Sequence, residues 1–290
     1  MDKITFKNKF QDEYPFKSHF LNLNGHNYHY VDEGRGEVVL MLHGNPTWSF
    51  YYRNLIKDLS QTHRVIVPDH MGCGFSDKPE DYPYHLESHI QNLVKLIHFL
   101  DLKKMIVVVH DWGGAIGFGM MTRYPQLIDK IIILNTAAFL SQNIPKRIAV
   151  LKGHPWSKFL IQNLNLFAWP ATFMTTKKTL SSKIKEGYLF PYSSVKERVA
   201  IHAFVDDIPL SKNHPSFQTL YEIQEKLKSL RGLPKLILWG GRDFCFDKTF
   251  FETWLQYYPD AEARWYADAG HYIIEDKQTE CLAEIREFIK

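Results

Sequence analysis

Short apolar runs alternate along the chain with segments whose apolar residues recur at helical spacing. The runs are rich in β-branched residues and end in turn residues, which is typical of buried strands. They cover 38–44, 63–69, 104–110, 130–135, 235–240 and 263–268. Helical spacing covers 50–59, 86–100, 113–124 and 277–289. This alternation predicts an α/β fold with a mostly parallel central sheet flanked by helices.

The alternation stops near Asn135 and resumes near Leu233. The segment between them is rich in aromatic residues, has helical patterns and contains no convincing strand. An insertion between two core strands would lie over the carboxyl edge of the sheet, where open α/β sheets bind ligands. We therefore expect residues 1–134 and 233–290 to form the core and residues 135–232 to form a helical cap. The alternative is an ordinary helical subdomain whose aromatic residues pack on one another.

Composition narrows the class of protein. The chain has 290 residues, 45% of them hydrophobic, which suits one α/β domain with an insertion. It carries 35 Lys and Arg against 32 Asp and Glu, a net charge of +3. A balance this even predicts neither a nucleic-acid partner nor affinity for an anionic membrane.

Three cysteines, Cys73, Cys245 and Cys281, show no metal-ligand spacing and favour a reduced, cytoplasmic setting. No apolar run approaches the ~20 residues of a transmembrane helix, and we expect no signal peptide. No metal or nucleotide motif stands out, so we expect no metal and no cofactor.

Three polar residues each follow a predicted strand. They are Asp111, Asp243 and His271, in the chain order nucleophile, acid, histidine of an α/β-hydrolase triad. Gly113 and Gly114 permit a tight turn directly after Asp111. Each residue alone is more often a turn former or an ordinary loop residue. Together, in this order, they predict a catalytic triad with Asp111 in the place that Ser usually holds.

The sequence "HGNP", residues 43–46, follows another predicted strand. In hydrolases of this fold, this loop and the residue after the nucleophile supply the two backbone N–H groups of the oxyanion hole. These would be the amides of Asn45 and Trp112. Their side chains are also hydrogen-bond donors, suited to an anionic leaving group such as a halide or a carboxylate. The alternative is that Trp112 only packs and Asn45 only caps a helix.

An Asp nucleophile changes the expected electrophile. A carboxylate is already ionised near pH 7 and can displace a leaving group at saturated carbon. The product is an ester of Asp111, against which His271, oriented by Asp243, could activate water. Asp111 therefore indicates alkyl halides, epoxides or strained rings as substrates.

The segments "HGNPTWSFYYR", "PDHMGCGFSDKP", "VHDWGGAIGFG" and "WGGRDFCFD…AGHY" resemble the haloalkane dehalogenase branch of the α/β-hydrolases. Epoxide hydrolases share the Asp, but their first loop usually has an aromatic residue at the position of Asn45. They also use two cap tyrosines, for which Tyr188 and Tyr192 are the candidates here. Some dehalogenases place the catalytic acid where this chain has Asn135, which cannot serve, so the resemblance leaves Asp243.

Four further segments, "LNTAAF", "FVDDIPLS", "WGGRDFCFDKTF" and "HYIIEDK", are similar to the β-lactone decarboxylases of bacterial long-chain olefin biosynthesis. This resemblance implies conversion of a cis-3,4-dialkyl-oxetan-2-one, a hydrophobic small molecule, to a cis-alkene and CO2. It also implies an assembly with the synthetase and thiolase-like enzymes of that pathway.

A haloalkane dehalogenase is the first alternative and an epoxide hydrolase the second. A catalytically inactive binding protein is a third, against which the intact Asp111, Asp243 and His271 argue. Within the cap, Arg198 is either a partner for a carboxylate or a solvated helix residue.

Overall fold

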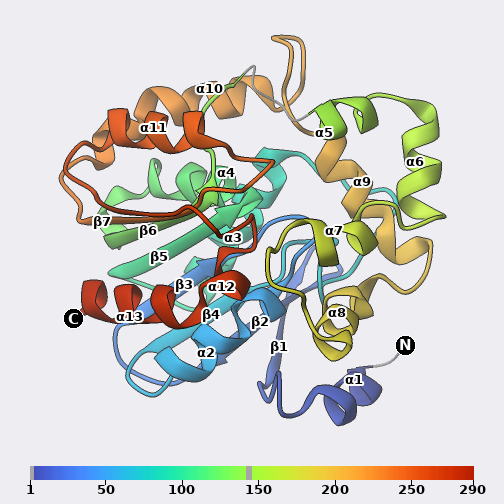
Figure 1. Cartoon of the computed structure of the whole chain (residues 1–290), viewed down its shortest axis with the longest axis horizontal. Coiled ribbons are helices and arrows are strands. Elements are labelled where there is room, and N and C mark those ends of the chain that lie inside the picture. Colours follow the sequence, from blue (N-terminus) through green and yellow to red (C-terminus); the bar gives the residue numbers. More distant parts are fainter. Residues whose placement is uncertain (1–2, 142–145) are drawn as a thin grey trace.

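A single eight-stranded sheet forms the centre of the computed structural model, which describes residues 3–141 and 146–290 (Figure 1). The strand order is β1-β2-β4-β3-β5-β6-β7-β8. The strands are β1 Ser18–Leu23, β2 His26–Glu33, β3 Val38–Leu42, β4 Arg64–Pro68, β5 Met105–Asp111, β6 Ile128–Thr136, β7 Lys235–Gly240 and β8 Glu262–Tyr266. Strands β3 to β8 are mutually parallel, whereas β1 and β2 pair antiparallel. The predicted α/β-hydrolase fold is confirmed.

Helices cover both faces of the sheet and bury a separate apolar cluster on each. They are α1 Lys3–Phe10, α2 Arg53–Leu59, α3 Leu86–Phe99, α4 Trp112–Met121, α5 Lys146–Leu151, α6 Pro155–Gln162, α7 Ala168–Met174, α8 Ser182–Leu189, α9 Val199–Asp206, α10 Phe217–Lys226, α11 Lys248–Tyr257, α12 Ile273–Asp276 and α13 Gln278–Ile289. Within the described residues, none of these helices has the length and apolar character needed to cross a bilayer.

The hairpin of β1 and β2 is absent from the sequence-based prediction. Strand β1 lies at the sheet edge and is half exposed, so it carries no continuous apolar run. Strand β2 mixes His, Asn and Asp with its buried tyrosines, which hides it from a search for β-branched runs. The fully buried strands β3, β5 and β7 were predictable because burial on both faces demands apolar residues throughout.

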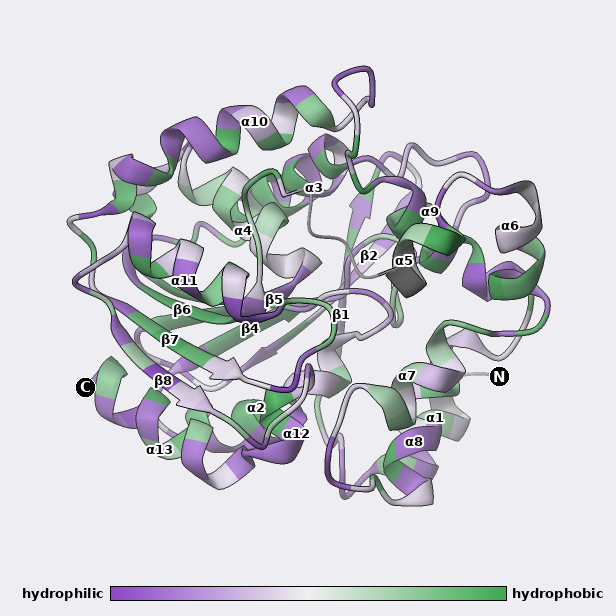
Figure 2. Ribbon diagram, turned by 45° about the horizontal axis from the view of Figure 1, so that its top comes forward, coloured by the Kyte–Doolittle hydropathy of each residue, from purple (hydrophilic) through white to green (hydrophobic). Residues whose placement is uncertain are grey.

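Six helices, α5 to α10, lie between β6 and β7, with no strand in the described part of that segment. Residues 142–145 of the predicted cap lie outside the described residues. Helix α10 packs on α3 and α4 (Figure 2). Its Leu220 and Ile223 belong to the same apolar cluster as the buried residues of those two helices. We therefore propose that the cap comprises α5 to α9 and that α10 belongs with the core.

The contact between α4 and β3 leaves no room for a side chain at Gly113. A Cβ there would lie 2.1 Å from the carbonyl oxygen of Leu42, a backbone atom that cannot move aside. We expect Gly113→Ala to lower the free energy of unfolding by about 1–3 kcal/mol. Gly232→Ala is the matched control, because no atom lies within 4 Å of its added Cβ, and it should change stability by less than about 0.5 kcal/mol. Urea denaturation measures both, and equal effects would contradict the packing argument.

Candidate active site

Asp111 stands at a sharp turn between β5 and α4. Its backbone has φ 52° and ψ −129°, a region that costs a non-glycine residue about 1–3 kcal/mol. The pairing of β5 with β6 shifts register between Val109 and Asp111, and the hydroxyl of Thr136 donates to the carbonyl oxygen of Asp111. Helix α4 begins at Trp112. The turn therefore lifts the Asp111 side chain above the carboxyl edge of the sheet.

The two carboxylate oxygens of Asp111 have different partners. Oδ1 accepts hydrogen bonds from the backbone N–H groups of Asn45, at 3.0 Å, and Trp112, at 2.5 Å. Oδ2 lies 3.2 Å from Nε2 of His271. Because Oδ1 is held by the two predicted oxyanion-hole amides, Oδ2 is the oxygen positioned to attack an electrophile.

His271 is held from its other ring nitrogen by Asp243. Nδ1 lies 2.8 Å from Oδ2 of Asp243, whose Oδ1 accepts the backbone N–H of Cys245 at 2.6 Å. The Asn135 side chain instead pairs with the backbone N–H and carbonyl of Gly240, at 2.8 and 3.1 Å. The fold thus brings Asp111, His271 and Asp243 together, and Asn135 joins β6 to β7 without contacting His271.

The three side chains are buried, so their charges interact strongly and affect the pKa values of Asp111 and His271. Burial alone would raise the pKa of Asp111, but the hydrogen bond and charge of His271 outweigh it and hold this pKa below its ordinary value. Burial would likewise lower the pKa of His271, yet Asp243 and Asp111 raise it to about 10. At neutral pH the resting site therefore holds an Asp111 carboxylate beside an imidazolium.

A cavity of about 270 Å³ lies against this pair, walled by core and cap. Its lining is mostly apolar, with residues such as Phe139, Met174 and Leu220, and it includes Asn45 and Trp112. No hydrogen bond joins the Trp112 indole to any described residue, so its N–H is free to serve a ligand. The Asn45 side chain donates to the carbonyl of Ile201 in the cap at 3.1 Å, so part of its predicted donor capacity is already used.

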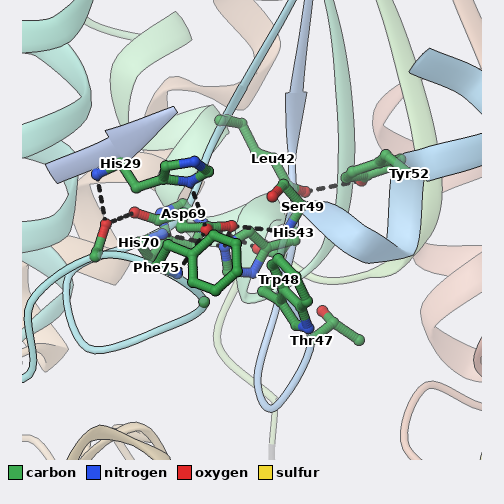
Figure 3. Close-up of polar contacts among 12 residues, drawn as sticks. His29, Leu42, His43, Thr47, Trp48, Ser49, Tyr52, Asp69, His70 and Phe75 are labelled. Carbon is green, nitrogen blue, oxygen red and sulfur yellow. Dashed lines mark hydrogen bonds and ion pairs between the residues drawn. The ribbon is translucent and has the colours of Figure 1, made fainter. Parts of the chain in front are cut away.

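Asp69, which the sequence analysis did not single out, contacts His29, Ser49 and Phe75 (Figure 3). Ser49 follows the loop after β3 that carries Asn45. Asp69 is fully buried and follows β4. Its carboxylate accepts the backbone N–H groups of Ser49, at 2.7 Å, and Phe75, at 2.9 Å, and lies 2.7 Å from Nδ1 of His29. It thereby joins the loop after β3 to the loop after β4. An acidic residue ending an apolar strand is the signal that could have found it.

Two more carboxylates attach the His271 loop to the cap. Glu275 forms a two-pronged ion pair with Arg53 and accepts the hydroxyl of Tyr188. Asp276 accepts backbone N–H groups from Lys177 and Lys178 of the cap and, at 2.6 Å, from Gly270 beside His271. Movement of the cap in this region would therefore disturb the position of His271.

The roles considered for three cap residues are wrong. The Tyr188 hydroxyl is bound to Glu275, and that of Tyr192 donates to the carbonyl of Thr47 at 3.3 Å. Neither residue lines the cavity, so the structure does not support a role for them in protonating an epoxide oxygen held beside Asp111. Arg198 is buried, not solvated, and its guanidinium donates to the carbonyls of Gln162, at 2.6 Å, and Tyr192, at 2.7 Å.

Ligand atoms of Asp243, Cys245 and His271 lie within 4.8 Å of one another, a spacing that could suit a metal. Their chemistry does not favour one. Burial and the charges of Asp243 and Asp111 raise the pKa of the Cys245 thiol well above its ordinary value, and a protonated thiol is a poor ligand. Asp243 and the Nδ1 of His271 already bond to each other. The group therefore suits proton chemistry better than metal binding.

Known proteins resemble the chain in sequence and in fold. A sequence profile of the α/β hydrolase fold matches residues 37–183. The cis-3-alkyl-4-alkyloxetan-2-one decarboxylase of Shewanella oneidensis is 43% identical over 95% of this chain and 89% of its own length. A protein of the same name from Xanthomonas campestris pv. campestris is 37% identical over 90% of this chain and 91% of its own.

The solved structure of haloalkane dehalogenase DbeA from Bradyrhizobium elkani has a TM-score of 0.85. It is 23% identical, and the match covers 94% of this chain and 97% of that one, so this likeness concerns the fold. The resemblance to both groups of proteins is confirmed.

The paired charges make stability depend on pH. The pKa of His271 is about 10 in the folded protein and 6.5 ordinarily, so between these values the folded state holds the extra proton. The contribution of protonated His271 to the free energy of unfolding is complete below about pH 6.5. It falls by ~1.4 kcal/mol per pH unit as the pH rises towards 10. In urea denaturation at several pH values, the stability difference between wild type and His271→Gln should shrink over this range. A constant difference would contradict the pairing, and His98→Gln, which removes an exposed imidazole, is the control.

Proposed function

The chain belongs to the α/β-hydrolase family, and from that membership and the geometry around Asp111 we propose that it is a carboxy-lyase acting on β-lactones. The reaction converts a cis-3,4-dialkyl-oxetan-2-one to a cis-alkene and CO2. Support comes from the two relatives named for decarboxylation of this ring, at 43% and 37% identity over most of the chain. The observation that carries the chemistry is the Asp111 carboxylate beside an apolar cavity, with Oδ1 held by two amides and Oδ2 available.

In the first step, Oδ2 of Asp111 attacks the ring carbon that bears the lactone oxygen. The carbon–oxygen bond of the strained ring breaks with inversion, and the electron pair leaves as a carboxylate. Trp112 lines the cavity beside Asp111, and a charge-assisted hydrogen bond from its indole N–H would stabilise this developing anion. The product is an alkyl ester of Asp111 that still carries the substrate's carboxylate.

In the second step, the bond to the carboxylate breaks and CO2 leaves. Its electron pair forms the carbon–carbon double bond and expels Asp111 as a free carboxylate. Inversion followed by anti elimination keeps the two alkyl groups cis. The two steps together consume no water and regenerate the Asp111 carboxylate. The adjacent His271 imidazolium stabilises the returning anion, and Asp243 holds the ring in place.

Attack at the lactone carbonyl is the rival route, through a mixed anhydride with Asp111. It creates a tetrahedral oxyanion, which needs preorganised donors. The amides of Asn45 and Trp112 are both engaged by Oδ1 of Asp111 itself. Because those donors already bind the nucleophile, the geometry favours attack at the ring carbon.

Haloalkane dehalogenation is the second candidate, favoured by the same nucleophile and by the indole donor of Trp112. In that reaction, ester formation removes the charge of Asp111 and so lowers the pKa of His271. His271 could then accept a proton from water that attacks the ester. Epoxide hydrolysis has less support, because the Tyr188 and Tyr192 hydroxyls are bound elsewhere.

We further propose a hydrophobic small-molecule substrate, supported by the mostly apolar cavity. A cytoplasmic location and an assembly with the synthetase and thiolase-like enzymes of olefin biosynthesis are also proposals, which rest on the sequence resemblance alone.

Three substrates offered to the purified protein separate the candidate reactions. A cis-dialkyl β-lactone should yield alkene and CO2, whereas a bromoalkane should release little bromide and an epoxide little diol. Gas chromatography and halide titration measure these products. Asp111→Asn should reduce alkene formation by about 10⁴-fold or more, because it removes the nucleophile. Fast bromide release without alkene formation would overturn the decarboxylase assignment.

Removal of His271 distinguishes a water-free route from a hydrolytic one. If no water is consumed, mass spectrometry of His271→Ala after incubation with a β-lactone should show little adduct on Asp111, because elimination itself frees the carboxylate. A hydrolytic enzyme that has lost its base would instead retain the ester. A stable stoichiometric adduct would therefore rule out the water-free route, and Asp111→Asn, which cannot form the ester, is the control.

A further inference from the structure

Exposed apolar side chains concentrate on one part of the cap. Of the thirteen exposed large hydrophobic side chains among the described residues, seven lie between residues 150 and 173. We call them the cap face: Val150, Trp156, Phe159, Leu164, Leu166, Trp169 and Phe173. They belong to α5, α6, α7 and the turns between them, at the end of the molecule opposite α13 (Figure 1).

Helix α7 of the cap face is apolar on both sides. In α7, Ala171 and Met174 line the cavity, while Trp169 and Phe173 contact each other outside, 54% and 48% exposed. An ordinary surface helix of a globular protein presents polar residues to water. Large exposed apolar side chains that concentrate in one part of a protein are typical of an interaction site.

The cavity beside Asp111 extends to the cap face, with which it shares Leu166. Leu166, in the turn between α6 and α7, lines the cavity and is 42% exposed. Leu210, which follows α9, also lines it and is 37% exposed. Apolar side chains therefore run from the surface to the reactive carboxylate, and a ligand entering here would meet the cap face first.

Basic residues outnumber acidic ones in the sequence that forms the cap face. From residue 146 to residue 185 the sequence contains eight Lys and Arg but no Asp or Glu. One of the eight, Lys183, lies 3.8 Å from Asp12 and from Glu13. Lys158, Lys177 and Lys178 are exposed. One acidic residue, Asp206, lies close by, and its carboxylate accepts the backbone N–H of Gly153 at 3.1 Å. The even charge of the whole chain hides this local excess, because the rest of the sequence is net acidic.

We propose that the cap face docks on the surface of an anionic lipid bilayer. Tryptophan and phenylalanine enter the boundary between head groups and acyl chains, and lysines pair with anionic lipids. A protein partner is less favoured, because the opening of an apolar cavity lies within the surface that would be covered. This proposal differs from the expectation drawn from net charge, which averages the charge over the whole chain.

Docking on a bilayer would explain how an apolar substrate reaches the cavity beside Asp111. This explanation rests on the proposed function. A dialkyl β-lactone and the alkene made from it both partition into bilayers. With the opening at Leu166 and Leu210 against the lipid surface, substrate could enter and product leave without crossing water.

Vesicle flotation with the full chain tests the proposal. The protein should float with vesicles of phosphatidylcholine and phosphatidylglycerol, bind phosphatidylcholine alone more weakly, and lose binding as salt rises. Phe159→Ser and Lys158→Ala should each lower binding roughly fivefold. Phe99→Ser is the matched control, since Phe99 is 58% exposed and Phe159 57%. Lys228→Ala, on the core side, is the control for Lys158→Ala.

Three outcomes would overturn docking: no flotation with either lipid mixture, equal losses in the control variants, or a cap face covered by a second copy or another protein. Sedimentation of Phe159→Ser beside wild type detects the second copy. Flotation needs no turnover, so a protein that floats but forms no alkene refutes only the proposed function. A protein that forms alkene from a short-chain lactone in solution but does not float refutes only the docking.

Discussion

The site depends on the burial of one negative charge. A carboxylate beside an apolar cavity loses most of its hydration, and the folded protein must replace what water supplied. Asp111 receives two backbone N–H groups on Oδ1 and the His271 ring on Oδ2. These groups come from the ends of different strands, so the anion can be accommodated only when β3, β5 and the loop after β8 meet at one edge.

That requirement explains several features far from the cavity. The amide of Asn45 is placed by a loop that Asp69 anchors from beneath, and the His271 loop is anchored by Glu275 and Asp276. Each anchor is a buried carboxylate whose lone pairs are filled by backbone or side-chain donors. Rigid support of this kind keeps the reactive groups close to their working geometry. The protein therefore surrounds one reactive carboxylate with three that only hold structure.

Cap and core divide the chemistry between them. The core supplies every charged group that touches Asp111, and the cap supplies apolar lining residues such as Leu166 and Met174. The cap also has polar residues that could have reached a substrate, namely Tyr188, Tyr192 and Arg198. Their side chains instead form hydrogen bonds within the cap or between the cap and the core. This division suits a reaction in which the core stabilises anions while the cap binds the alkyl chains of the substrate.

The sequence by itself determined the α/β fold and the meeting of Asp111, Asp243 and His271, because each follows a buried strand and strand ends are set by local patterns. It could not determine which cap side chains are free, since hydrogen bonds such as that of Tyr188 to Glu275 join residues distant in the chain. The net charge of the chain did not reveal the basic residues of the cap, because it sums all charges without regard to where they lie. Only tertiary structure decided that Asp69 is a buried anchor, that the aromatic residues of α6 and α7 are exposed, and that Leu166 beside them lines the cavity. Those properties depend on which surfaces meet, and that follows from packing across the whole molecule.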